Sequence, residues 1–108
     1  MAQITITSSD VSGVKGKTKL LKFSGQLDET NVEAEAQKVY QIMDKDKPKH
    51  FIFDFTDLTY LNSKSIGFIA DWQQKIATNG GKLLIFGAAP NIFDILDVVG
   101  LTNLVDLV

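Results

Sequence analysis

The chain has 108 residues, of which 44% are hydrophobic and 22% charged, with a formal net charge of −2; these proportions are typical of a globular protein, and we expect a single domain over residues 1–108. Its 11 basic residues are outnumbered by 13 acidic ones and form no long basic run, which argues against a nucleic-acid-binding surface. The sequence has no cysteine, no signal-like start and no apolar run of about 20 residues, so we predict a cytoplasmic protein without disulfides or direct membrane insertion.

The first part of the chain predicts a hairpin followed by a helix. Residues 4–7 alternate apolar and β-branched side chains, and residues 19–25 form a second strand candidate. Between them, the sequence GVKGKT at 13–18 has its glycines too close together for a phosphate-binding loop and is followed by a strand, which favours a hairpin turn. From Glu29 the apolar spacing predicts a helix that ends by Pro48, with Asp28 or Thr30 as its cap.

The remaining elements alternate strands with helices. Residues 50–55 and 82–87 are almost continuously apolar, which is typical of central parallel strands. An apolar stripe from Ile66 to Ile76 predicts a helix that stops at residues 78–81, and a shorter helix from Ile92 should end at Gly100, before a last strand within residues 103–108. The predicted fold class is α/β in the order ββαβαβαβ, with a mixed sheet of roughly four or five strands and helices packed against it.

The polar residues in and just after the predicted strand at 50–55 suggest no catalytic or metal site. His50 is the only histidine and lies on the entry side of its strand, away from the end where sites on open α/β sheets gather. Asp54 and Asp57 are more typical of local turn and capping bonds than of an acidic pocket. We therefore predict no catalytic residues, no bound metal and no cofactor, and a protein that is not an enzyme.

The bend at residues 62–67 is the best candidate site. It follows a predicted parallel strand and precedes a helix, where unpaired amides and the helix dipole favour negative charge. Asn62 or Ser63 alone would cap the helix, with a contribution of about 1 kcal/mol. From the residues alone, a cap without any further function and a binding site both remain open.

Three segments together resemble STAS domains, the sulfate transporter and anti-sigma factor antagonist module. These segments are KFSGQLDETN at 22–31, FIFDFTDLTYLNSKSIGFI at 51–69 and NGGKLLIFGAAPNIFDILDVVGLTNLV at 79–105. The resemblance covers nearly the whole chain. It places Asp28 at the acidic residue beside the family's phosphorylation site and Ser63 at the first hydroxyl position. Lys64 occupies the position of the phosphorylated Ser or Thr, Asn62 replaces the usual Asp, and Ser65 replaces a glycine.

The resemblance implies a protein-binding regulator similar to anti-sigma factor antagonists, whose partner is a serine-kinase-like anti-sigma factor. Because lysine forms no stable phosphate ester, we expect the usual phosphorylation switch to be absent, with Ser63 or Ser65 as substitute acceptors only if the register shifts by one residue. We also expect Lys64 to lie as a cation beside Asp28. The predicted partner-binding residues are Asp28, Asn62, Ser63, Lys64, Ser65, Ile66 and Phe68.

Two other functions remain open. The resemblance also fits an accessory subunit of a membrane transport complex, a role that needs no phosphorylation. A small anion or nucleotide could instead bind at the bend, where Lys64 and the helix amides lie together. A second copy of the chain, forming a homodimer, is a further partner left open.

Overall fold

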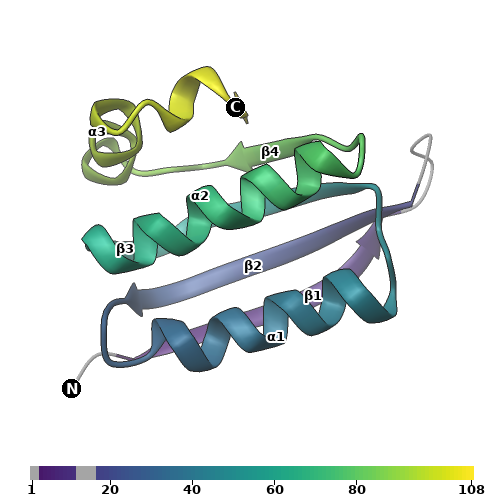
Figure 1. Cartoon of the computed structure of the whole chain (residues 1–108). Helices are drawn as coiled ribbons and strands as arrows, with labels where there is room; N and C mark the ends of the chain where they lie inside the picture. The colour runs from purple at the N-terminus through teal and green to yellow at the C-terminus, as the bar shows by residue number, and fades with distance from the viewer. Residues whose placement is uncertain (1–2, 12–16) are drawn as a thin grey trace.

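The computed structural model describes residues 3–11 and 17–108. In this part of the chain, strands and helices follow in the predicted order ββαβαβαβ (Figure 1). A short 3₁₀ helix, η1, comes before the last strand. The elements are β1 (Ile4–Val11), β2 (Thr18–Leu27), α1 (Val32–Lys45), β3 (His50–Leu61), α2 (Ser63–Thr78), β4 (Leu83–Phe86), α3 (Pro90–Val98), η1 (Leu101–Asn103) and β5 (Asp106–Leu107).

The strands form one mixed sheet in the order β1-β2-β3-β4-β5. β1 and β2 pair antiparallel, whereas β2, β3, β4 and β5 are mutually parallel. The predicted α/β fold with a mixed sheet is therefore confirmed. The pairing of β2 with β3 extends to Leu27 opposite Leu61, so these two strands end side by side. The segments that follow them, residues 28–31 and the start of α2, consequently begin at the same edge of the sheet.

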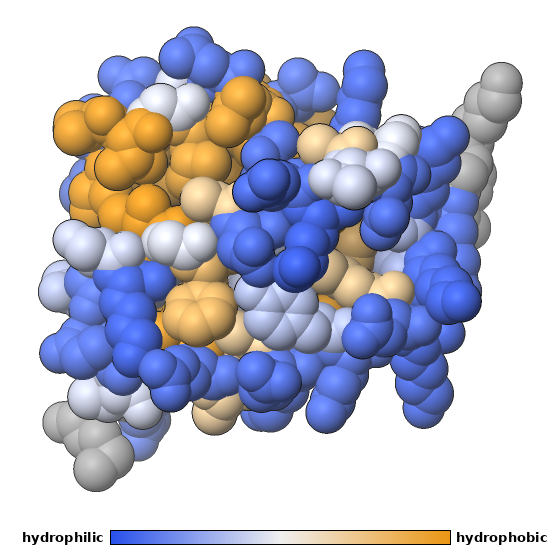
Figure 2. Space-filling model, viewed as in Figure 1, coloured by the Kyte–Doolittle hydropathy of each residue, from blue (hydrophilic) through white to orange (hydrophobic). Residues whose placement is uncertain are grey.

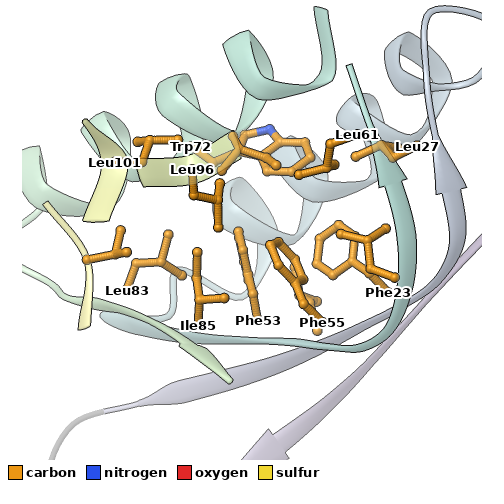
Figure 3. Packing of buried hydrophobic residues seen from close by; sticks show 14 of the residues in the cluster. Phe23, Leu27, Phe53, Phe55, Leu61, Trp72, Leu83, Ile85, Leu96 and Leu101 are labelled. Atoms are coloured by element: carbon orange, nitrogen blue, oxygen red, sulfur yellow. The ribbon is translucent and has the colours of Figure 1, made fainter. Parts of the chain in front are cut away.

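The helices cover one face of the sheet, and the core lies between these two layers (Figures 1 and 3). Alternate residues of β3 point to opposite faces. Phe53 and Phe55 are fully buried on the helix side, where they pack with Phe23 of β2 and Trp72 of α2. Ring centroids in this group are 5.1 Å apart for Phe23 and Phe55 and 5.9 Å for Phe53 and Trp72. This aromatic group fixes α2 against the central strand, because each such side chain contributes about 1.5–3 kcal/mol on burial.

The central strand is longer than its apolar run. The apolar pattern predicts a strand over residues 50–55, but β3 continues to Leu61 because β2 pairs with it along almost the whole length. Leu58 and Leu61 remain buried in this polar second half. The pairing has two register shifts, between Lys22 and Ser24 and between Gly25 and Gln26 of β2, and at each of them β3 contains one extra residue. The mostly polar residues 56–61 therefore belong to the strand, and the bend expected at 62–67 consists of the cap residue Asn62 and the first turn of α2.

The first helix begins later than predicted. α1 begins at Val32 and not at Glu29, and the expected cap at Asp28 or Thr30 is wrong. The Asp28 carboxylate instead accepts hydrogen bonds from the backbone N–H and hydroxyl of Thr30, at 2.9 and 2.6 Å, which stabilises a turn before the helix. Asn31 occupies the N-cap position without a side-chain capping bond. The predicted ends of the other helices are confirmed, with Gly80 and Gly100 in left-handed conformations just beyond α2 and α3.

Two further expectations concern the hairpin turn and membrane insertion. The hairpin turn expected at 13–18 falls largely on residues 12–16, which lie outside the described residues. Within the described ranges, no helix is long and apolar enough to cross a membrane.

Candidate functional site

The start of α2 is fixed by a capping box, in which the side chains of two residues bond to each other's backbone. Asn62 has an extended backbone, and its Oδ1 accepts a hydrogen bond from the backbone N–H of Ser65 at 3.0 Å. The Ser65 hydroxyl oxygen accepts one from the backbone N–H of Asn62 at 2.8 Å. This geometry confirms Asn62 as the cap and satisfies amides that would otherwise be unpaired at the helix start.

The predicted contact residues at the start of α2 differ in their exposure to solvent. Ser63 and Lys64 are exposed on the first turn of α2, whereas Ser65 is fully buried. Ile66 and Phe68 are half-buried and pack against the core. The structure thus brings Ser63 and Lys64 to the surface and places Ser65 beneath it. A partner that approaches this turn meets Ser63 and Lys64 first.

The lysine of this turn makes an ion pair that the sequence reasoning missed. Its Nζ lies 2.6 Å from Oε1 of Glu33, on the first turn of α1, whereas the acidic neighbour expected from the sequence was Asp28. The hydrogen bond from Lys64 and its charge lower the pKa of Glu33 below its usual range. Both side chains are largely exposed, so solvent screens the pair and it contributes little to stability. Glu33 therefore orients the Lys64 side chain. A partner protein that replaces Glu33 as the contact of Lys64 breaks only a weak ion pair.

A second acidic residue borders the bend. The Asn62 side-chain amide donates a hydrogen bond to the Glu29 carboxylate, in the segment between β2 and α1. Asp28 precedes Glu29, and hydrogen bonds from Thr30 lower the pKa of the Asp28 carboxyl. Asp28 thus lies on the same edge as Asn62, as expected, but three carboxylates accompany the one lysine here. The neighbouring acids Glu29 and Glu33 could be found in the sequence only by placing α1 beside α2, because they lie more than 30 residues from their partners.

This arrangement is poorly suited to a free anion. The backbone N–H of Ser65 is bonded to the Asn62 side chain, and that of Ile66 to the Asn62 carbonyl at 3.0 Å. The carboxylates of Glu29 and Glu33 bond to the side chains of Asn62 and Lys64, so negative charge is already present at this turn. A groove of about 690 Å³ does lie between α1 and α2, but it is lined by residues such as Tyr40, Asp71 and Lys75 and not by the bend.

The other candidate residues have structural roles. Nδ1 of His50 accepts a hydrogen bond from the backbone N–H of Lys82 at 3.0 Å, which joins the entry ends of two strands. Asp54 accepts two hydrogen bonds from Thr56, and Asp57 pairs with Lys22 on β2 at 3.2 Å. Among the residues that the structure describes, no group of three acidic or histidine side chains is placed to hold a metal ion.

Comparison with known proteins agrees with this fold. The model of the family described as "STAS domain" matches residues 10–108. An anti-sigma factor antagonist from Mycobacterium paratuberculosis is similar in structure, with a TM-score of 0.83 at 20% identity over 97% of this chain and 85% of that one. The Bacillus cell fate determinant SpoIIAA, in its phosphorylated form, has a TM-score of 0.70 at 16% identity, over 94% of this chain and 91% of that one.

The same fold also occurs within a much larger protein. The murine anion transporter Slc26a9 has a TM-score of 0.69 at 13% identity. The match covers 92% of this chain but only 19% of the transporter. At these identities the structural comparisons show a shared fold.

Proposed function

The chain belongs to the STAS domain family, and from this premise we propose that it is a non-enzymatic regulatory module that binds a partner protein through the start of α2. The proposed contact residues at the surface are Ser63 and Lys64, with Asp28 and Asn62 beside them and the half-buried Ile66 and Phe68 behind. The partner would be a serine-kinase-like anti-sigma factor, as for an anti-sigma factor antagonist. The proposal places the protein in the cytoplasm.

One observation carries this proposal: an exposed lysine and serine are held on a rigid helix start. The capping box fixes the backbone of the turn, and the 2.6 Å pair with Glu33 positions the Lys64 amine. Preorganised side chains lose little conformational freedom on binding, which favours a protein contact. We propose that the protein is not an enzyme because the polar side chains nearby already bond to neighbouring residues in the fold.

The proposal includes the loss of the usual phosphorylation switch, because lysine stands where the family resemblance places the phosphate acceptor. Ser63 is the better of the two substitute acceptors, since it is exposed at the first position of α2. The Ser65 hydroxyl is buried and bonded to Asn62, so a phosphate there would require the capping box to open. A phosphate on Ser63 would gain from the helix dipole but would face the carboxylates of Glu29 and Glu33.

A second candidate is an accessory subunit of a membrane transport complex. The structural likeness to a segment of Slc26a9 favours it, because the same fold is there part of an anion transporter. In this role too, the start of α2 would be the contact surface, and no phosphorylation would be needed.

Affinity capture from native lysate tests the proposal, with partners identified by mass spectrometry. Lys64→Glu should lose the partner, but it also sets an acid against Glu33. The double variant Lys64→Glu/Glu33→Lys restores an ion pair with reversed charges and therefore serves as the matched control for stability. We expect both variants to lose a kinase-like partner that the wild type retains.

Each other result has a clear meaning. Recovery of the partner in the double variant would show that only the intact ion pair matters and would contradict direct contact by Lys64. Capture of transporter components in place of a kinase-like protein would favour the second candidate. Stoichiometric phosphate on Ser63 in the native cell would contradict the loss of the switch.

A further inference from the structure

A patch of exposed apolar side chains lies on α3 and on the residues that directly follow α3 and η1. We call Phe93, Val98, Val99 and Leu104 the α3 patch; their exposed fractions are 39%, 86%, 51% and 60%. In Figure 2 it belongs to the broad hydrophobic area at the upper left, over the position of α3 in Figure 1. Ile92 and Leu96 of the same helix are fully buried in the core. α3 and the turns after it thus expose large apolar side chains in addition to the buried ones, which indicates a docking surface.

Acidic residues interrupt this patch in a regular way. Asp94 is four residues before Val98, and Asp97 is four residues after Phe93, so each acid shares a helical row with an apolar residue. Both acids are exposed, and neither takes part in an ion pair with a residue that the structure describes. The Asp97 carboxylate accepts a hydrogen bond from the Thr102 hydroxyl at 2.8 Å, which fixes its position.

The segment that carries the patch is acidic. Residues 83–108 contain three aspartates and no lysine, arginine or histidine. Lys82 precedes this segment and lines a hollow with Leu104 and Asp106, but it forms no ion pair with Asp94 or Asp97. The α3 patch therefore combines exposed apolar area with two exposed carboxylates that form no ion pair with a described residue.

We propose that the α3 patch docks a cationic amphipathic helix of a partner protein. Such a helix carries apolar and basic side chains at spacings of three and four residues, which matches the alternation of Phe93, Asp94, Asp97 and Val98. Pairing with a second copy of the chain would instead set these aspartates against each other, because neither α3 nor η1 supplies a cation. An anionic membrane surface is disfavoured for the same reason. The proposal is independent of the contact proposed at the start of α2.

Two synthetic helical peptides test the charge preference. They share the same leucine positions, and one carries lysine and the other glutamate at the remaining positions. Each is labelled and titrated with the full chain by fluorescence anisotropy. We expect binding of the lysine peptide, and a dissociation constant for the glutamate peptide at least about tenfold weaker, since like charges at a contact oppose binding.

Matched variants then locate the binding site. Asp94→Asn should weaken the lysine peptide about two- to fivefold, as expected for one exposed ion pair. Val98→Ser should weaken it about tenfold, because the valine no longer buries its methyl groups. The controls are Asp44→Asn and Ala34→Ser, which make similar changes at exposed positions of α1. They should leave binding unchanged.

Several results would overturn the proposal. These are equal binding of the two peptides, no binding of either at millimolar peptide, or an Asp44→Asn effect as large as that of Asp94→Asn. Sedimentation equilibrium provides an independent check. A dimer of the wild-type chain that Val98→Ser dissociates would assign the patch to a second copy, whereas a monomer is the expected result.

Discussion

Asn62→Ala should destabilise the fold more than other surface asparagine substitutions, because it removes the capping box of α2. Loss of a side-chain cap costs about 0.5–2 kcal/mol. The substitution also leaves the backbone N–H of the buried Ser65 without its 3.0 Å acceptor, and an unsatisfied buried donor costs about 1–3 kcal/mol. These two costs describe the same lost bond, so we expect a decrease in the free energy of unfolding of about 1–2 kcal/mol.

Urea unfolding measures this change through the fluorescence of Trp72, which is the only tryptophan and is fully buried. The slope of free energy against urea should be unchanged, and the melting temperature should fall by roughly 5–15 °C for a domain of this size. Asn79→Ala, at the other end of α2, is the control and should cost less than about 0.5 kcal/mol. If Asn62→Ala cost no more than Asn79→Ala, the capping box would not be what fixes this turn.

Three further predictions concern other parts of the fold. A hydrogen bond from Lys19 and the charge of that lysine lower the pKa of Asp46, so its stabilising contribution is present above an ordinary aspartate pKa and lost as pH falls; the melting temperature of Asp46→Asn should depend less on pH between about 5 and 2. Burial and a hydrogen bond to an aspartate raise the pKa of Tyr40 to about 12, so the stabilising contribution of Tyr40 is lost as pH rises through about 10 to 12. Alkaline denaturation monitored by circular dichroism should therefore show a smaller loss of stability over this range for Tyr40→Phe than for the wild type. Gly67→Ala adds a methyl group in open space on a helix and should stabilise by about 0.5–1 kcal/mol in urea unfolding, whereas Gly25→Ala places Cβ against the backbone oxygen of Gln3 at φ +114° and should destabilise by more than about 1 kcal/mol.

Local patterns in the sequence predicted the features that depend on nearby residues. The apolar periods located the helices, and Asn62 was among the cap candidates because capping involves residues only three apart. Gly100 ended α3 because its left-handed conformation is open to glycine at low cost. The family resemblance agreed with the element order, which the structure confirms.

Features that depend on distant residues were not predictable in this way. Pairing with β2 extends β3 through a polar segment that has no continuous apolar run, so the strand end at Leu61 was missed. The ion pair of Lys64 with Glu33 requires two helices to lie side by side, and no local pattern reports this. Ser65 is buried because its hydroxyl turns back to the cap, although serines 63 and 65 look equivalent in the sequence.

The central claim is that the first turn of α2 contacts a partner protein. Site-specific photo-cross-linking in the native cell tests it most directly, with the cross-linking amino acid placed at Ser63 and, in a matched control, at Thr78, which is exposed at the other end of the same helix. We predict one defined cross-linked product with another protein from position 63 and none from position 78. Absence of a product at position 63, or the same products from both positions, would contradict the claim.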